Sequence, residues 1–277
     1  MLVEVVGQEI GISGAVFACD VPCVQPLSTN VPFLPVPADR RMQLLQARLC
    51  CAMRHGFNTL YQFYSEKQRR DLNPALGVDP QAGMPYPRTF KLHGQENDIP
   101  LVYTSPLSRS PNRMLFLAHA QTDDGDDATK VVLVKFCPEY NEEAHRVAAG
   151  GGFAPKLYSC EFLDCGFYMV VMDFIDNCSY WGRNGKQESE TSKALLRSFL
   201  SLFAGHDLVH GDLRGPNVLV KDDDQIFVID FDWAGKHGVA RYPVAVNREE
   251  NWAEGVEVGR VMKKEHDEYC IRRLLGE

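Results

Sequence analysis

Residues 210–217 carry the group of side chains best suited to chemistry. They read HGDLRGPN, which has the form H-x-D-x4-N, and a second acidic motif, DFD, follows at residues 230–232. In magnesium-assisted phosphoryl transfer, one carboxylate orients the attacking hydroxyl and accepts its proton. An amide oxygen and a second carboxylate hold the metal that bridges the phosphates. The set therefore predicts phosphoryl transfer. The alternative is a solvated turn with a capping aspartate and a core histidine.

Short apolar runs flank these groups and predict how they are held. VLV at 218–220 and IFVID at 226–230 are typical of strands, and KDDDQ between them favours a tight turn. A rigid hairpin would place the polar groups near its ends. That placement matters because phosphoryl transfer depends mostly on positioning and on charge neutralisation.

Lys135 is the upstream candidate for contact with a phosphate. It lies near the end of the apolar run VVLVKF, where an unpaired ammonium group would be costly to bury. Acidic partners follow at Glu142 and Glu143 on a predicted helix. We favour Glu143, because Val147 lies one turn further along its face, although Glu142 remains open. The alternative is a lysine on an edge strand that faces water.

Together these motifs resemble the protein kinase-like superfamily over about residues 98–240. VVLVK, an acidic helix residue, MVVMDFI, HGDLRGPN and DFD follow one another in the order of that superfamily. The HGD form is similar to that of aminoglycoside and choline phosphotransferases and of other atypical kinases. The Arg214 neighbourhood and DFDWAG resemble a fungal protein kinase-like family.

The resemblance implies a nucleotide site for ATP. Lys135 would contact the α- and β-phosphates and pair with Glu143. Backbone groups of Met172, Asp173 and Phe174 would meet the adenine.

On the transfer side, the resemblance implies that Asp212 is the catalytic base and that Asn217 and Asp230 hold Mg²⁺. Arg214 would neutralise the transferred phosphoryl group, since its guanidinium is always charged. The alternative for Arg214 is a surface ion pair. His210 is predicted to form structural hydrogen bonds and not to carry the proton.

The sequence departs from the kinase pattern in three places. Where a glycine-rich loop is expected, the sequence reads PLSRSPN. The hydroxyls of Ser105, Ser108 and Ser110 are candidate hydrogen-bond donors to phosphate in place of that loop. The alternative is an ordinary polar hairpin loop. Asp232 replaces the glycine of DFG and either restricts the backbone or adds a carboxylate. No APE motif follows, and the remaining chain is short for a full peptide-binding lobe.

The predicted fold is α+β: a bilobal protein kinase-like domain over residues 96–277 after an N-terminal extension over 1–95. The N-lobe, 96–175, has five strands with a helix after the third. The C-lobe, 176–277, is truncated and mostly helical. Periodic apolar residues predict helices over about 38–68, 192–205 and 249–275, and Pro/Gly-rich residues 69–95 predict a linker.

Composition narrows the possible partners. The net charge is −8 and 45% of residues are hydrophobic, so neither bulk binding to nucleic acid nor disorder is expected. The nine cysteines have no metal-site spacing beyond Cys19 and Cys23, which favours reduced thiols. The acidic start and the lack of a long apolar run predict an intracellular, cytoplasmic protein without membrane contact.

The sequence thus predicts an ATP- and Mg²⁺-dependent phosphotransferase whose acceptor is a hydroxyl of Ser/Thr type. One alternative is a pseudokinase that acts as a binding module, which the absent glycine-rich loop and short C-lobe favour. The other is a small-molecule kinase, which the HGD form permits.

Overall fold

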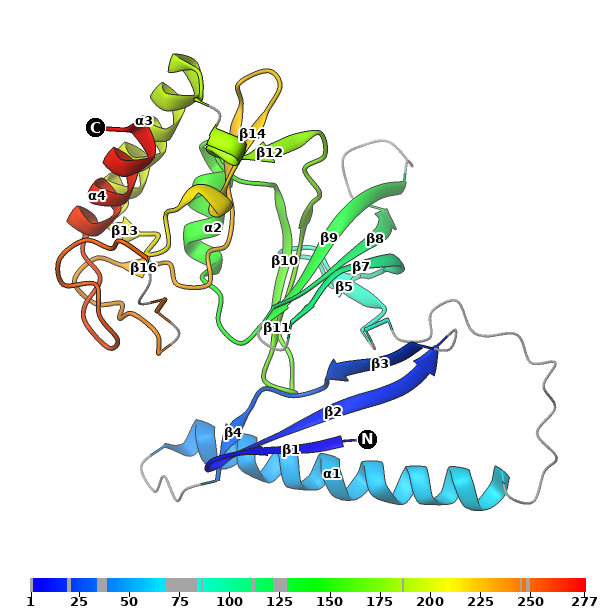
Figure 1. Ribbon diagram of the computed structural model, residues 1–277. Helices are drawn as coiled ribbons and strands as arrows, with labels where there is room; N and C mark the ends of the chain where they lie inside the picture. Colours follow the sequence, from blue (N-terminus) through cyan, green and yellow to red (C-terminus); the bar gives the residue numbers. More distant parts are fainter. Residues whose placement is uncertain are drawn as a thin grey trace. The chain divides into compact units, whose positions relative to one another are not determined.

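The computed structural model describes most of the chain and is α+β, as predicted (Figure 1). No described helix is both long and apolar enough to cross a membrane. The described residues are 2–18, 21–33, 39–67, 84–85, 87–110, 113–121, 129–185, 187–244, 246–247 and 250–277. Most of the predicted linker 69–95 and the hairpin turn at 122–128 lie outside them.

The chain divides into two compact units. Unit 1 comprises Met1–Pro138 and Glu161–Val170, and unit 2 comprises Glu139–Cys160 and Val171–Glu277. The predicted domain boundaries after residues 95 and 175 stay predictions.

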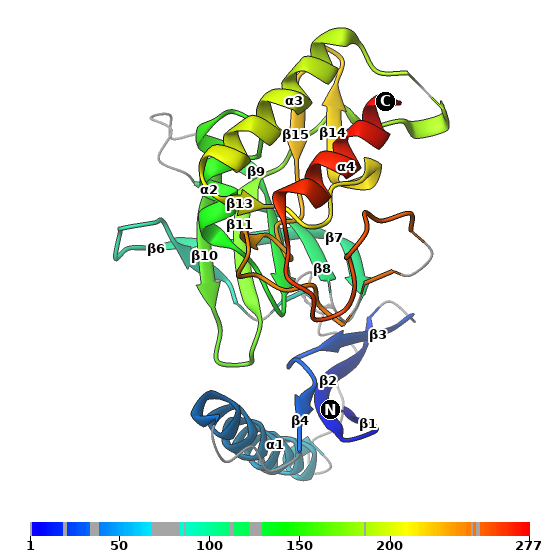
Figure 2. The ribbon, with the colours of Figure 1, turned by 90° about the vertical axis from the view of Figure 1, so that its left-hand side faces the viewer.

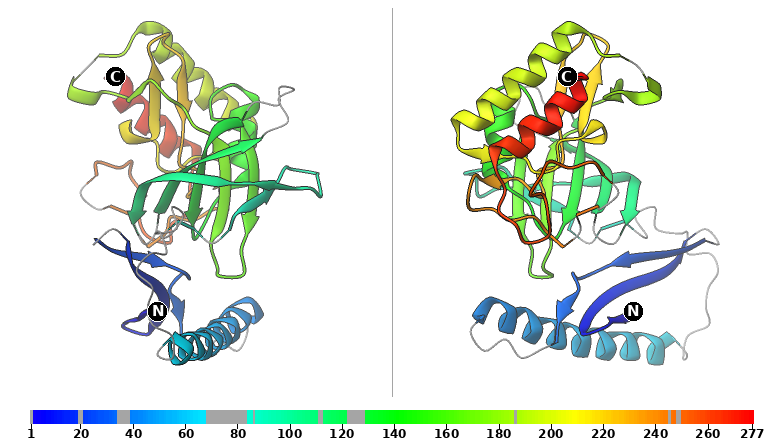
Figure 3. Two further views of the ribbon diagram at one scale, coloured as in Figure 1. Left: turned by 90° about the vertical axis from the view of Figure 1, so that its right-hand side faces the viewer. Right: turned by 60° about the vertical axis from the view of Figure 1, so that its left-hand side comes forward.

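A five-stranded sheet is the main element of unit 1, and the boundary between the units falls within β10 and within β11. The strand order is β10-β11-β9-β8-β7, and Figure 3 shows the strands from two sides. Alternate residues of β8 are buried, as expected for a strand with one face on the core. This confirms the five predicted strands and the helix after the third. Their bounds are β7 Val102–Ser110, β8 Arg113–Gln121, β9 Thr129–Cys137, β10 Leu157–Phe162 and β11 Tyr168–Asp173.

A second sheet and a long helix form the N-terminal part of unit 1. Strand β2 pairs with β1, β3 and β4, and α1 lies along this sheet (Figure 1). Ile12, Val31 and Leu49 form the small core between them. The Asp39 carboxylate accepts the Met42 N–H at the start of α1. The bounds are β1 Leu2–Val6, β2 Glu9–Ala18, β3 Val21–Pro26, β4 Val31–Pro32 and α1 Arg40–Lys67, followed by the short pair β5 Thr89–Lys91 and β6 Asp98–Pro100.

Three helices surround the core of unit 2: α2 Glu142–Gly150, α3 Glu190–Gly205 and α4 Lys264–Leu275. Helices α3 and α4 lie side by side (Figure 2). The apolar face of α3 buries Leu196, Phe199 and Phe203 almost completely. Each such side chain contributes about 2 kcal/mol or more when fully buried.

Short strands complete unit 2 and flank the motif residues. Strand β13 Leu208–Val209 pairs with β16 Gly235–Lys236, and β14 Val218–Lys221 pairs with both β12 Cys178–Tyr180 and β15 Ile226–Val228. The β14–β15 hairpin is the one predicted between the two chemical motifs. Two 3₁₀ turns, Arg183–Gly185 and Gly215–Asn217, lie outside the strands.

The helix predicted over 249–275 is wrong in its first half, because α4 begins only at Lys264. Gly255 and Gly259 have φ values of 88° and 73°, which an α-helix does not accommodate. The apolar residues Val256 and Met262 instead join a small core with Val209 and Tyr242.

Asn141 connects the start of α2 to the segment that follows DFD. Its side-chain oxygen accepts the Ala144 N–H at 2.8 Å, and its amide nitrogen donates to Ala234 O at 2.9 Å. Its backbone N–H also donates to Phe231 O at 3.1 Å. Phe231 itself is fully buried, and the His145 ring stacks on it at 4.8 Å.

Asn141→Ala should lower the free energy of unfolding by about 1–3 kcal/mol, because the cap of α2 and the bond to Ala234 are both lost. Urea denaturation measures the change. Glu139→Ala, at an exposed position just before, is the control and should stay within about 0.5 kcal/mol of the unaltered protein. Equal stability of the two variants would contradict this connecting role for Asn141.

Candidate active site

The centre of the site is a pair of buried side chains, Asp212 and Asn217, which are 6% and 1% exposed. The Asn217 amide nitrogen donates to Asp212 Oδ2 and to the Asp212 backbone oxygen, both at 2.8 Å. Both bonds use the amide N–H groups, so they fix which end of the Asn217 side chain faces away from Asp212.

The other end of Asn217 is a buried acceptor for which the described part of the chain supplies no donor. Among the described residues, no group donates a hydrogen bond to Asn217 Oδ1. A buried polar atom left unpaired is costly unless a ligand satisfies it. An amide oxygen is a ligand that Mg²⁺ accepts, together with one or two carboxylates and substrate phosphates. Asn217 Oδ1 therefore fits a ligand of a Mg²⁺ ion that a nucleotide helps to hold, and Asp230 as the second ligand stays a prediction.

The described residues contain no group of three or more His, Cys, Asp or Glu side chains placed to bind a metal by themselves.

The β14–β15 hairpin positions Asn217 next to the DFD motif. Val218 and Val228 pair across the hairpin, and Ile229 N–H donates to Asn217 O at 2.9 Å. Asp230 comes directly after Ile229 and has a φ of 73°, which is uncommon for a residue other than glycine. Such strained backbone is often found at functional sites.

Gly215 explains how tightly the 3₁₀ turn before Asn217 packs. A Cβ added to Gly215 would lie 2.7 Å from the Trp181 backbone oxygen, so only glycine fits without movement. The Asn217 N–H donates to Arg214 O at 2.8 Å and closes this turn.

Burial, together with the neighbouring charges, sets the acidity of Asp212. Burial raises the pKa of Asp212 to about 6, and the charge of Asp230 adds to this effect. The Arg214 guanidinium and the Asn217 hydrogen bond oppose it. Arg214 Nε lies 2.9 Å from Asp212 Oδ1, and Arg214 Nη1 lies 3.7 Å from Glu250 Oε1. Asp212 is thus a carboxylate that is charged at neutral pH but able to take a proton.

His210 has structural contacts, in line with its predicted hydrogen-bonding role. It is fully buried, Asp212 N–H donates to its Nδ1 at 3.3 Å, and its Nε2 lies 3.1 Å from Ile229 O. These partners assign the proton to Nε2, which donates to Ile229 O. The ring also packs edge-on against Phe231 at 5.3 Å.

The sequence analysis missed Asp267 on α4, which holds the HGD backbone. Its carboxylate accepts the His210 N–H at 2.6 Å and the Gly211 N–H at 3.0 Å. Burial raises the pKa of Asp267 to about 7. The two N–H donors act in the opposite direction and lower this pKa, because they stabilise the charged carboxylate. The available signal was an acidic residue on the buried side of an amphipathic helix, since Cys270 and Ile271 share that side.

Gly211 has a φ of 79°, which favours glycine at the middle of HGD. A Cβ there would lie 3.0 Å from Met262 Sδ and 3.6 Å from Trp233 Cβ, so Met262 and the residue after DFD both pack against the motif.

The predicted nucleotide-binding residues lie in different elements. Lys135 is buried on β9 at 4% exposure, in unit 1. Glu143 lies on α2 in unit 2, and its carboxylate pairs with Lys236 at 2.6 Å. The pairing of Lys135 with Glu143 stays a prediction. The other candidate, Glu142, pairs with Arg146 on its own helix.

Met172 and Asp173 end β11, and Phe174 follows at 37% exposure. The Asp173 N–H already donates to Lys156 O at 3.0 Å, and its carboxylate accepts the Tyr158 hydroxyl at 2.6 Å. If adenine binds here as predicted, it must use the other backbone N–H and C=O groups of Met172, Asp173 and Phe174.

The predicted serines lie in the β7–β8 hairpin. Irregular pairing occurs between Tyr103 and Ser105 and again between Pro106 and Ser108, while Ser110 pairs with Arg113. Asp232 is half-buried in the turn after Phe231.

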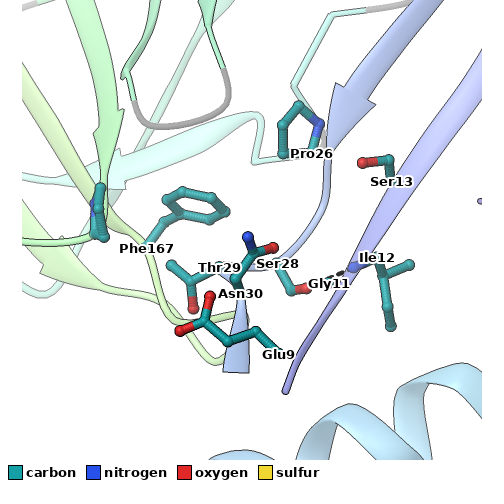
Figure 4. Close-up of a pocket in the computed structure, with 10 residues that line it drawn as sticks. Glu9, Gly11, Ile12, Ser13, Pro26, Ser28, Thr29, Asn30 and Phe167 are labelled. Carbon is teal, nitrogen blue, oxygen red and sulfur yellow. Dashed lines mark hydrogen bonds between the residues drawn. The ribbon is translucent and has the colours of Figure 1, made fainter. Parts of the chain in front are cut away.

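A separate cavity of about 300 Å³ lies in unit 1 and contains none of the predicted catalytic residues (Figure 4). Glu9 and Asn30 face Phe167 across it, and Ser28 Oγ accepts the Ile12 N–H at 2.9 Å. Among the described lining residues there is no cationic side chain, so nothing in its lining favours a phosphate.

Comparison with known proteins identifies one matching family model. The model of the RIO domain matches residues 160–238, which include Asp212, Asn217 and Asp230 but not Lys135. The RIO domain is an atypical protein kinase family. The match therefore supports a kinase-like phosphotransferase.

The solved structure of the kinase PK-1 of Cydia pomonella granulovirus is also similar, with 16% sequence identity and a TM-score of 0.41. The match covers 50% of this chain and 53% of that kinase chain, so it spans only about half of the viral protein. No curated protein matches the chain.

Asp267→Ala should lower the free energy of unfolding by about 2–5 kcal/mol, because two buried N–H groups lose their acceptor. Chemical denaturation measures this change. Glu268→Ala alters the exposed neighbour on α4 and should have almost no effect. If Asp267→Ala were as stable as Glu268→Ala, Asp267 would not hold the loop.

Proposed function

We propose that the chain is an ATP-dependent phosphotransferase that moves the γ-phosphoryl group to a hydroxyl, with Asp212 as the base. The observation that carries this proposal is the Asp212–Asn217 pair. The amide N–H groups of Asn217 donate to Asp212, while the buried amide oxygen of Asn217 has no donor among the described residues. A base and an available metal ligand are thereby fixed to each other.

The residues of the chain account for the transfer step. The acceptor oxygen would attack the γ-phosphorus, its proton would pass to Asp212, and the bond to the ADP oxygen would break. Asn217 and Asp230 would hold Mg²⁺, which neutralises phosphate charge when bound. Arg214 adds a fixed positive charge beside Asp212 and would neutralise part of the charge on the transferred phosphoryl group.

The acceptor that we propose is a Ser/Thr-type hydroxyl of a protein. The RIO-domain match supports it, because that family consists of protein kinases. Membership of the fungal family with HGDLR and DFDWAG is part of the same proposal, with the motifs themselves as its support. Lys135 as the phosphate contact, Met172–Phe174 as the adenine contact and a cytoplasmic location stay predictions.

Asp212→Asn should lower phosphotransfer by at least about 10²-fold while nucleotide binding changes little, since the amide cannot accept the proton. Labelled ATP with peptide and metabolite pools measures turnover, and thermal shift with Mg-ATP measures binding. Asp222→Asn alters an exposed aspartate in the β14–β15 turn and serves as control.

The peptide and metabolite pools also distinguish a protein kinase from a small-molecule kinase and from a pseudokinase. Labelled metabolites without labelled peptides would replace the protein acceptor by a small molecule. Binding of Mg-ATP without any labelled product would favour the pseudokinase. Full turnover in Asp212→Asn would contradict the assigned base.

Turnover should fall as pH drops through about 6, because the raised pKa of Asp212 leaves more of the base protonated there. Arg214 lowers the pKa of Asp212, so Arg214→Gln should move this acid limb to higher pH. Rates of both proteins from pH 5 to pH 8, at saturating Mg-ATP, test the shift. A limb that stays in place in Arg214→Gln would mean that another group controls the profile.

A further inference from the structure

Arg214 joins the candidate base to a segment that none of the motifs includes. Its Nε lies 2.9 Å from Asp212 Oδ1 and its Nη1 lies 3.7 Å from Glu250 Oε1. A guanidinium is a rigid, planar fork with several N–H groups, so it can contact two carboxylates at once. Arg214 and Glu250 are about one-third exposed, whereas Asp212 is 8% exposed by its side chain.

The turn that presents Glu250 is held by two hydrogen bonds of Trp252 within the same segment and by one from α4. Trp252 Nε1 donates to Asn247 O at 2.7 Å, and Trp252 N–H donates to Glu250 O at 3.1 Å. The Arg273 side chain, on α4, donates to Asn251 O. Glu250 therefore belongs to a held turn and not to a free surface loop.

Trp233 ties the same turn to the DFD motif. Its ring lies 6.1 Å from that of Trp252 and 6.3 Å from that of Tyr242. Tyr242 is in turn bound to His266 Nδ1 through its hydroxyl at 2.9 Å. Because Trp233 follows Asp232 directly, the second motif and the Glu250 turn share one support.

The geometry points to a role for these contacts that rests on the proposed function. We propose that Glu250 is a positioning residue, which fixes the orientation of the Arg214 guanidinium beside Asp212. A guanidinium held by Asp212 alone could rotate about one ion pair. Held by two carboxylates, it is preorganised to stabilise the charge of the transferred phosphoryl group. Trp233 and Trp252 serve this arrangement by supporting the turn.

The competing explanation is an incidental surface ion pair. Pairs of this exposure contribute little to stability, so their number or presence does not establish a role. The two explanations differ in what they predict for turnover and for the combination of variants.

Glu250→Gln keeps the size of the side chain and removes its charge. It should lower kcat about three- to fivefold, with KM for ATP within twofold, because Arg214 acts on the transferred group and not on nucleotide binding. Glu254→Gln changes an exposed glutamate of the same segment and should leave both constants unchanged. Unchanged kcat in Glu250→Gln would overturn the proposal.

The double variant supplies the decisive comparison. Arg214→Gln with Glu250→Gln should have the kcat of Arg214→Gln alone, since Glu250 acts only through Arg214. Losses that multiply would mean that Glu250 acts elsewhere, and would overturn the proposal.

Urea midpoints of the unaltered protein, Arg214→Gln, Glu250→Gln and the double variant give a readout that requires no turnover. The shift of the double variant should be smaller than the sum of the single shifts, whereas additive shifts would show that the two side chains are not coupled. Absence of turnover in the unaltered protein would instead refute the proposed function, together with the catalytic role of Glu250. Normal turnover with an unaffected Glu250→Gln would refute this inference alone.

Discussion

The hydrogen bond from the Asn217 amide to the Asp212 carboxylate is the interaction on which the candidate site depends. It is 2.8 Å long, and both partners are almost fully buried. Because the amide nitrogen is used in this bond, the amide oxygen is left as an acceptor. One contact thus fixes the proposed base and the proposed metal ligand relative to each other, and it requires the backbone of HGDLRGPN to be held firmly.

Distant parts of unit 2 hold that backbone. Asp267 on α4 accepts two N–H groups of the motif, and Ile229 N–H donates to Asn217 O just before DFD. Buried Phe231 packs against both His145 and His210. The hydrogen bonds are short and the groups are shielded from water, so the geometry of the site is a property of the whole unit and not of the loop alone.

Much of this could be predicted from the sequence where the pattern is local. The strands β7 to β11, the helices α1 to α3 and the β14–β15 hairpin follow from apolar periodicity and turn residues. Asp267 and Glu250 could not be found in this way, since they reach the motifs across more than 35 residues of chain. The helix predicted over 249–275 is wrong in its first half, because Gly255 and Gly259 have positive φ values. The apolar residues Val256 and Met262, which suggested a helix, pack instead in a small core with Val209.

A crystal structure with Mg²⁺ and a non-hydrolysable ATP analogue tests the central claim most directly. The account predicts a metal about 2.1 Å from Asn217 Oδ1, with Asp230 as a second protein ligand and the Asn217–Asp212 hydrogen bond intact. A metal bound elsewhere, or an Asn217 whose amide has turned away from Asp212, would contradict it.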